Sequence, residues 1–360
     1  MRSLFKRFLH WYLVQISWRM RRFFPGLPIL MWRYLWGSSK EMRIRVHGLF
    51  TKPKLDRSWF SKRFSDLIDQ QIRAEISIPS SAGGQINILS VTISPDNDIV
   101  AFGTKLSGRW RFLDHLELKG GKIYTETIGI RLSEDFRVES FSTVKGTETT
   151  NELGIWTDVR ATRKPEGYWL THARGGRPVE PSLNRISAIP LDKSFRVSGP
   201  EKIFSSPTNN VRERNWTPID TGSCGTPKYL YFPAADESGS SEEAALTPLR
   251  ALKSPISSRL AGGTPLVEIE NYGWFCIAHE RLTSPIRHYL HYVLGYTRSE
   301  NGFEMTSVSD SFYFETPLGN EFCTGLVRRD DELLISNQAG NRAFIYSIPI
   351  HEFVETFCAQ

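Results

Sequence analysis

The sequence predicts an all-β fold built from repeated antiparallel sheets. Five times, a short strand candidate runs through a turn into a burst of large apolar residues. The bursts begin 45 to 69 residues apart and cover residues 99–102, 168–170, 229–232, 274–277 and 333–335. Units of this length made of short strands cannot bury their own faces, so they must stack on their neighbours. The pattern is typical of β-propeller blades, and it predicts a five-bladed β-propeller over residues 41–358.

A second strand candidate precedes each apolar burst. These candidates cover residues 86–94, 155–162, 215–221, 264–270 and 321–328. Turn-forming residues separate strand from burst, as in Asp96-Asn97-Asp98 and Pro165-Glu166-Gly167. Because the first strand of each blade lines the axis of a propeller, the early residues of these five strands should meet at one mouth of a central channel.

Positive charge is concentrated at the N-terminus. Residues 1–45 contain ten Lys/Arg and one acid, whereas the rest of the chain contains 35 bases and 38 acids. A body without a basic excess argues against a nucleic-acid partner.

The four cysteines form no CxxC pair, which argues against a zinc site and favours a reducing, cytoplasmic location. We expect no metal site; a calcium ion held by acids at the channel mouth is the alternative.

Residues 1–40 are expected to form a basic, amphipathic N-terminal extension, helical at its start. Bases interrupt its apolar run before the roughly 20 residues that a spanning helix needs. Basic residues mixed with Trp and Phe suit a helix that lies on an anionic membrane surface, which would make the protein peripheral at the inner membrane through residues 1–24. The alternative is a helix packed on the propeller or on a partner chain.

Polar and charged residues fall at the positions that should share one channel mouth. They are Asn87, Asp158, Arg160, Arg214, Asn215, Thr264 and Glu321 from the first strands, with His172, Arg174, His279 and Glu280 from the strands that return beside them. Burying such a set without a purpose is costly, so the constellation predicts a ligand site. The alternative is that these groups pair with one another and fasten neighbouring blades.

Four segments, taken in order, resemble a known superfamily. They are Arg214-Asn215-Trp216-Thr217-Pro218, Gly262-Gly263-Thr264-Pro265 with His279-Glu280, Tyr289-Leu290-His291, and Glu321-Phe322-Cys323-Thr324-Gly325-Leu326. They look like the five-bladed propellers of mannoside phosphorylases and hydrolases, and like the related propellers found beside bacterial glycosyltransferases. The resemblance covers about residues 80–352. It implies a glycan or oligosaccharide ligand and a glycosyltransferase partner.

The same resemblance implies specific chemistry. Thr157-Asp158-Val159-Arg160 matches the strand that carries the general acid, with Val in place of the family's Pro, so Asp158 is the expected proton donor. Such a donor needs a carboxyl whose pKa is raised by burial or by a neighbouring negative charge. Hydrolysis also needs a second carboxylate to position water, and Glu321 or Glu280 is the candidate.

The resemblance further implies a site for inorganic phosphate as a co-substrate, with no other cofactor. Arg214, Asn215 and His279 match the family's phosphate-binding residues. The family's lysine is missing, and the segment 219–221 with Asp220 stands in its place. Asn87, Arg160 and Thr264 complete the expected substrate-binding set.

Two further segments bear on function. The final blade carries Ser336-Asn337-Gln338 where related domains have aromatic and acidic groups; amides bind sugar hydroxyls but perform no acid–base work. The segment 234–258 is long for a blade connection and is a candidate lid over the channel.

Three functions therefore stay open. The first is cleavage or transfer of a mannoside-like glycosidic bond, by hydrolysis or phosphorolysis, with Asp158 as acid. The second is a non-catalytic glycan-binding or scaffolding propeller in a membrane-associated polysaccharide-synthesis system. The third is a protein-interaction ring, which predicts a channel mouth filled by Trp216 and other apolar groups.

Overall fold

The computed structural model describes residues 61–77, 85–106, 108–111, 115–118, 125–144, 155–175, 184–204, 215–222, 225, 227–230, 246–247, 249–250, 260–282, 288–300, 302–315, 321–340 and 342–358. The expected N-terminal extension, Arg214 and most of the 234–258 segment lie outside the described residues, as do the side chains of Asn87 and Arg174. No helix in the described part is long and apolar enough to cross a membrane.

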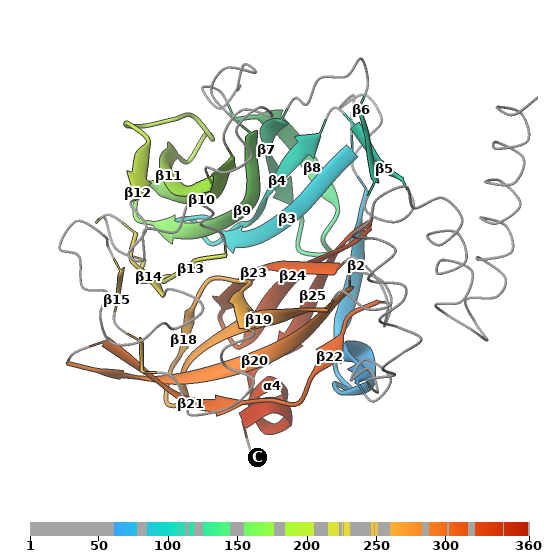
Figure 1. Cartoon of the computed structure of the whole chain (residues 1–360), viewed down its shortest axis with the longest axis vertical. Coiled ribbons are helices and arrows are strands. Elements are labelled where there is room, and N and C mark those ends of the chain that lie inside the picture. Colours follow the sequence, from blue (N-terminus) through green and yellow to red (C-terminus); the bar gives the residue numbers. More distant parts are fainter. Residues whose placement is uncertain are drawn as a thin grey trace, which may run out of the picture.

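The described chain is mainly β-structure, which confirms the predicted all-β class. Five sheets of three or more strands follow one another along the sequence, and Figure 1 shows them succeeding one another around the molecule. Sheet I contains β3 (Gln85–Ile93), β4 (Ile99–Leu106), β7 (Thr125–Leu132) and β8 (Val138–Thr143). Sheet II contains β9 (Ile155–Lys164), β10 (Gly167–Gly175), β11 (Asn184–Asp192) and β12 (Lys202–Phe204). Sheet III contains β13 (Thr217–Pro218), β14 (Tyr229–Leu230) and β15 (Leu246–Thr247).

The last two sheets also recruit strands from elsewhere in the chain. Sheet IV joins β17 (Leu260–Gly262), β18 (Val267–Ile269), β19 (Gly273–Leu282), β20 (His288–Ser299), β21 (Gly302–Val308) and β22 (Phe312–Tyr313) to β16 (Leu249–Arg250) and to β1 (Lys62–Arg63). Sheet V contains β23 (Glu321–Arg329), β24 (Glu332–Ala339) and β25 (Arg342–Pro349), with β2 (Ile72–Ile76) at its edge. A small ribbon pairs β5 (Gly108–Arg111) with β6 (His115–Leu118).

In the part of the chain that the structure describes, the apolar bursts form second strands that are buried on both faces. In β19, Trp274 and Cys276 pack into a cluster that includes Leu230 of sheet III. The alternating residues Phe275 and Ile277 pack into a different cluster, together with strands of sheet V. Because successive side chains of a strand point to opposite faces, a strand between two neighbouring sheets must be apolar at every position. This explains the continuous apolar runs in the sequence.

The first strands of sheets I, II and V are joined by side chain–backbone hydrogen bonds. Ser90 in β3 donates to the Thr324 carbonyl of β23 at 3.0 Å and accepts from the Ala161 amide of β9 at 3.0 Å. Ser336 donates to the Leu89 carbonyl at 2.7 Å. A Cβ on Gly325 would lie 2.2 Å from the Ser336 oxygen, so this close approach requires glycine. The first strands of sheets I, II and V therefore contact one another directly, whereas the meeting of all five at one channel mouth stays a prediction.

The predicted strands 215–221 and 264–270 are shorter than expected. Only Thr217–Pro218 and Val267–Ile269 pair as strands within them. Pro218 has no amide hydrogen to donate to a ladder, and Asn215 has a left-handed backbone with φ of 62°. Both features limit the length of β13.

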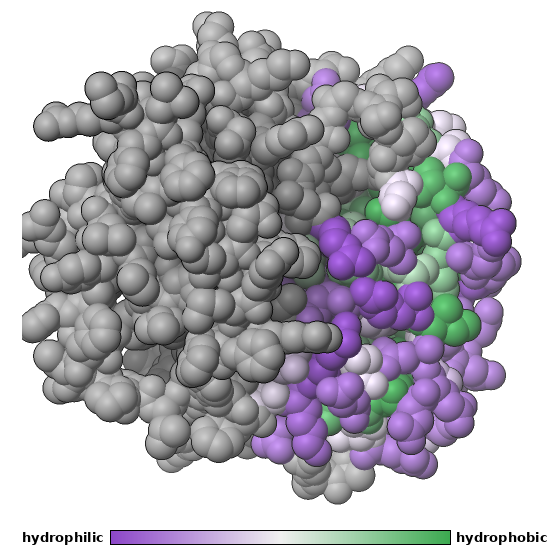
Figure 2. Space-filling view, turned by 90° about the vertical axis from the view of Figure 1, so that its right-hand side faces the viewer, coloured by the Kyte–Doolittle hydropathy of each residue, from purple (hydrophilic) through white to green (hydrophobic). Residues whose placement is uncertain are grey.

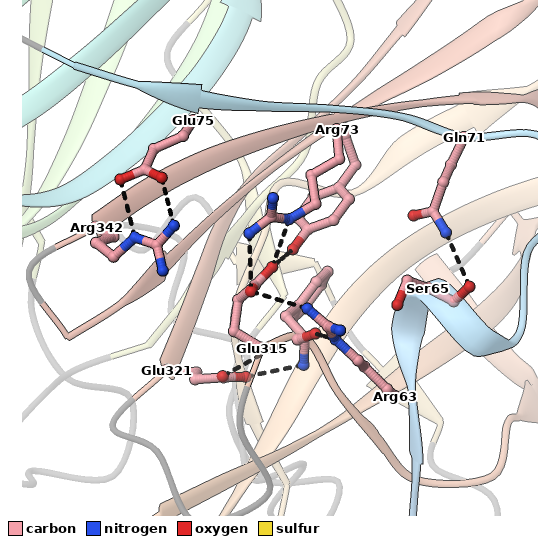
Figure 3. A network of polar contacts seen from close by, with 10 residues as sticks. Arg63, Ser65, Gln71, Arg73, Glu75, Glu315, Glu321 and Arg342 are labelled. Carbon is pink, nitrogen blue, oxygen red and sulfur yellow. Dashed lines mark hydrogen bonds and ion pairs between the residues drawn. The ribbon is translucent and has the colours of Figure 1, made fainter. Parts of the chain in front are cut away.

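A segment that we call the strap, residues 61–76, fastens sheet IV to sheet V. Its β1 pairs in parallel with β22, and its β2 pairs antiparallel with β25. Figure 3 shows Glu315 between two arginines of the strap, Arg63 and Arg73. The Glu315 carboxylate accepts from Arg63 at 3.0 Å, from Arg73 at 2.7 Å and from the Tyr346 hydroxyl at 2.6 Å. In Figure 2, the coloured part of the surface is mostly hydrophilic, with small separate apolar patches.

The described chain ends in α4 (Ile350–Cys358), an amphipathic helix that follows β25. Its Phe353 and Phe357 are buried, and the Phe357 ring stacks on Phe64 of the strap with centroids 6.1 Å apart. Glu352 accepts hydrogen bonds from the amides of Asp69 and Gln70 at 2.5 and 2.9 Å. The strap and α4 thus stabilise each other.

Candidate functional site

Asp158 lies on a β-bulge of β9. The ladder between β9 and β10 pairs Arg160 with Thr171 but Thr157 with Ala173, so β9 contains one extra residue there. Asp158 has φ of 57°, in the left-handed region that Asp and Asn tolerate better than most residues. It is partly exposed, whereas the next two residues are buried. Bulges interrupt the regular alternation of a strand and redirect a side chain, and they are frequent beside active sites.

Arg160 is buried behind Asp158, with 1% of its surface exposed. Its guanidinium donates to the Asp158 carbonyl at 2.9 Å, to the Gly263 carbonyl at 2.5 Å, to the Gly262 carbonyl at 3.2 Å and to the Asn215 side-chain oxygen at 3.3 Å. These partners come from sheets II, III and IV. Among the described residues, no carboxylate lies within ion-pair distance of Arg160. Arg160 therefore holds three sheets together through neutral acceptors.

Two buried histidines lie in the electrostatic field of this arginine. Burial and the Arg160 charge lower the pKa of His172 to about 3. Burial lowers the pKa of His279 to about 3, with smaller effects from Arg160 and Arg281. Both imidazoles are neutral near pH 7, so His279 can donate one hydrogen bond to a ligand but carries no positive charge.

Irregular backbone accumulates at this end of the first strands. β3 has a bulge between Asn87 and Leu89, and β23 has one between Cys323 and Gly325, in addition to the one at Asp158. Asn215 beside sheet III has a left-handed backbone, and a Cβ on Gly262 or Gly263 of sheet IV would collide with the Asn215 or the Ile277 carbonyl. The sequence interpretation found the polar residues of this region but missed the bulges, whose only signal was a polar residue interrupting an apolar strand.

Glu321 is fully buried and engaged elsewhere. Its two carboxylate oxygens accept the amides of Phe314 and Glu315, each at 2.8 Å, as Figure 3 shows. This pairing orders the segment that presents Glu315 to the strap. The expected role of Glu321 as a second catalytic carboxylate stays a prediction, and the contacts favour a structural role.

Glu280 and Thr264 are also interior. Glu280 is 3% exposed and accepts the Tyr292 hydroxyl at 3.0 Å. It lies next to His279 in β19, so the two side chains point to opposite faces of the strand. Thr264 donates to the Pro265 carbonyl and accepts the Ile277 amide at 2.9 Å. The structure thus gathers Asp158, Arg160 and Asn215 but places Glu280 and His279 on different faces.

The amide-rich segment of β24 and the residue in the lysine position also lie away from the surface around Asp158. Asn337 and Gln338 are 0% and 1% exposed, so their amides face the interior. Asp220 accepts the Gly222 amide at 3.4 Å, and burial raises its pKa to about 6, against the lowering effect of Arg163. Since Arg163 lies five residues beyond Asp158 along β9, Asp220 belongs to the other end of that strand.

A cavity of about 760 Å³ lies at the opposite end of sheet V from Glu321. It is lined by strap residues 69–72, by residues 329–332 between β23 and β24, and by Ser347, Pro349 and His351. It contains none of the predicted site residues. Over the part of the chain that the structure describes, no group of three or more His, Cys, Asp or Glu is placed to hold a metal ion.

Comparison with known structures identifies the type of fold. The structure is similar to that of the β-1,2-mannobiose phosphorylase from Listeria innocua in complex with β-1,2-mannobiose, with a TM-score of 0.51 and 11% identity over 83% of this chain and 99% of that one. It is also similar to a glycosyl hydrolase from Bacteroides ovatus, with a TM-score of 0.50 and 10% identity over 80% and 92% of the two chains. No family model and no curated protein sequence matches the chain. In fold, the chain resembles the mannoside phosphorylases and hydrolases, as its motifs predict.

Proposed function

We propose that the five sheets are the blades of a five-bladed propeller, and that this propeller cleaves or transfers a mannoside-like glycosidic bond with Asp158 as general acid. The observation that carries the proposal is the bulge at Asp158, locked from behind by buried Arg160. The bulge presents a partly exposed carboxyl at the end where the first strands converge. Arg160 prevents that backbone from relaxing, and catalysis requires such a fixed donor.

The proposed substrate class is supported by the likeness in fold. A phosphorylase of β-1,2-mannobiose shares it, and its bound disaccharide supports a manno-oligosaccharide as the ligand here. Inorganic phosphate is the proposed co-substrate of a phosphorolytic route, held by Arg214, Asn215 and His279. Arg160 is not part of this proposed phosphate site, because its guanidinium donates to oxygen atoms of the protein.

The competing function is glycan binding without catalysis, in a membrane-associated polysaccharide-synthesis system. A specific observation favours it: both candidate second carboxylates, Glu280 and Glu321, are buried and hydrogen-bonded within the protein. In this proposal a glycosyltransferase is the partner, and residues 1–24 attach the protein to the cytoplasmic face of the membrane. Binding of the full chain to anionic vesicles, lost when the bases of residues 1–24 are replaced by Ser, tests that attachment.

The decisive experiment measures product release from β-1,2-mannobiose and longer manno-oligosaccharides, with and without phosphate. Asp158→Asn is the informative variant because Asn tolerates the left-handed backbone and keeps the size of the side chain. Asp310→Asn is its control, since Asp310 is exposed and lies between β21 and β22 of sheet IV. Mannose 1-phosphate formed only with phosphate, and lost in Asp158→Asn alone, establishes a phosphorylase. Release without phosphate, lost in the same variant, establishes a hydrolase. Binding without turnover supports the competing function.

A further inference from the structure

The interface between sheets IV and V changes from apolar to polar toward the candidate site. Val293 of β20 and Ile335 of β24 belong to one buried cluster. Two residues along each strand, on the same faces, come His291 and Asn337. His279 of β19 stands directly opposite His291 in the ladder. These three side chains form a layer between the apolar core and the surroundings of Arg160.

Asn337 is a polar residue of this layer whose side chain has no hydrogen-bond partner in the protein. The residue is 0% exposed, and neither its side-chain oxygen nor its side-chain nitrogen has a hydrogen-bond partner in the protein. An amide can make four hydrogen bonds, and a buried amide that makes none is strongly destabilising. Its ladder neighbours, Cys323 and Phe344, offer side chains with little or no hydrogen-bonding capacity.

His291 faces the same interface and also lacks hydrogen-bond partners of good geometry. It is 1% exposed, and both ring nitrogens lack a partner of good geometry. The Phe312 backbone lies near the ring but outside hydrogen-bonding geometry, and the Phe314 ring packs edge-on with centroids 4.9 Å apart. Two buried polar side chains from facing sheets thus lack partners at one level of the interface.

We propose that this layer is a water-binding site, in which ordered water bridges Asn337 of sheet V to His291 of sheet IV. The chemistry fits water because the layer offers both donors and acceptors, and a buried water needs two to four polar partners. A metal ion does not fit, since no cluster of three ligating groups exists among the described residues. The site does not depend on the proposed function. His279 is the ladder neighbour of His291 on the same face, so the proposed water lies beside that ring.

The test counts internal water by oxygen-17 magnetic relaxation dispersion on the full chain. Wild type is compared with Asn337→Leu, which is close in size but cannot hydrogen-bond. The proposal expects at least one long-lived water fewer in Asn337→Leu, together with a lower melting temperature. It is overturned by an unchanged count, or by a variant that is more stable than wild type, which is the behaviour of a dry, unpartnered amide.

Two further variants keep the proposal testable if Asn337→Leu fails to fold. Asn337→Ser keeps hydrogen-bonding capacity and leaves more space, so its water count should equal or exceed that of wild type; a lower count contradicts the site. His291→Phe should remove the same water. If water couples the two residues, the melting-temperature shifts of His291→Phe and Asn337→Ser will not add in the double variant, and additive shifts would show independent residues.

Discussion

Arg160 donates a hydrogen bond from Nη1 to the carbonyl oxygen of Asp158, at 2.9 Å and two residues earlier in the same strand. The carbonyl is that of Asp158 itself, the residue whose backbone is left-handed with φ of 57°. The same guanidinium holds the Gly262 and Gly263 carbonyls of sheet IV. The arginine of the Asp-Val-Arg motif is therefore a positioning residue: it fixes the backbone on which the proposed acid stands.

Replacing Arg160 by Lys should lower the free energy of unfolding by about 3 kcal/mol. A lysine keeps the charge, but it cannot reach acceptors in three sheets at once, so buried carbonyls lose their donors. Chemical denaturation followed by tryptophan fluorescence measures the loss. Arg185→Lys is the control, because Arg185 lies exposed in the same sheet and should change stability by less than about 0.5 kcal/mol. If the free energy of unfolding of Arg160→Lys equals that of wild type, the guanidinium contacts contribute little to stability.

Replacing Glu321 by Gln should cost about 2 kcal/mol of stability. Both carboxylate oxygens accept backbone amides, and the Gln side chain turns a donor toward one of them. Thermal unfolding measures the effect, with exposed Glu139→Gln as the control. If Glu321→Gln unfolds like wild type and abolishes turnover, Glu321 is the second catalytic carboxylate after all.

The buried His172 should make the protein sensitive to acid. Burial, reinforced by Arg160, lowers its pKa to about 3, well below the value of about 6.5 in an unfolded chain. The unfolded state therefore binds the extra proton first, and stability falls as the pH drops from about 6.5 toward 3. In His172→Gln, the slope of stability against pH between 4 and 6 should decrease by about 1.4 kcal/mol per pH unit.

Denaturant titrations at several pH values give this slope. His351→Gln, at an exposed position, is the control for the effect of a His-to-Gln replacement. An unchanged slope in His172→Gln would mean that His172 is protonated in the folded state over this range. Burial also lowers the pKa of His279 to about 3, so the stability of His172→Gln should still fall with decreasing pH, with a smaller slope than that of wild type.

The strands of the fold could be predicted because a strand that is buried on both faces appears in the sequence as a continuous apolar run. The burst at 274–277 is apolar at every position since β19 packs between two clusters. The strap could not be predicted in this way. β2 pairs with β25 more than 260 residues later in the chain, and its sequence Ile-Arg-Ala-Glu-Ile places apolar and charged residues as any half-exposed strand does.

The candidate site was predictable only in part. A polar residue in an apolar strand marked Asp158 and Arg160, but nothing local showed that Arg160 points inward or that Glu280 and His279 point to opposite faces. The one-residue bulges decide which side chains face the site, and a bulge shifts the alternation without changing composition. Facing directions after a bulge therefore required the structure.

The strap should detach more easily when Glu315 is replaced by Gln. Burial opposes ionisation of Glu315, but hydrogen bonds from Arg73 and Tyr346 and the charges of Arg73 and Arg63 outweigh it and lower its pKa. An acid whose pKa is lowered on folding stabilises the protein fully at pH values above its pKa in the unfolded chain, near 4.5. This stabilisation is lost as the pH falls below that value toward the folded pKa. Glu315→Gln should therefore cost about 1–2 kcal/mol at pH 7 and less at pH 3.5.

Glu75→Gln is the matched control for this last prediction, because Glu75 also pairs with an arginine across the β2–β25 ladder but is more exposed. Its loss should be about 0.5 kcal/mol. Hydrogen exchange of the β2 amides separates strap opening from global unfolding, and these amides should exchange faster in Glu315→Gln than in Glu75→Gln. Equal exchange in the two variants would mean that backbone pairing with β25, and not the Glu315 cluster, holds the strap in place.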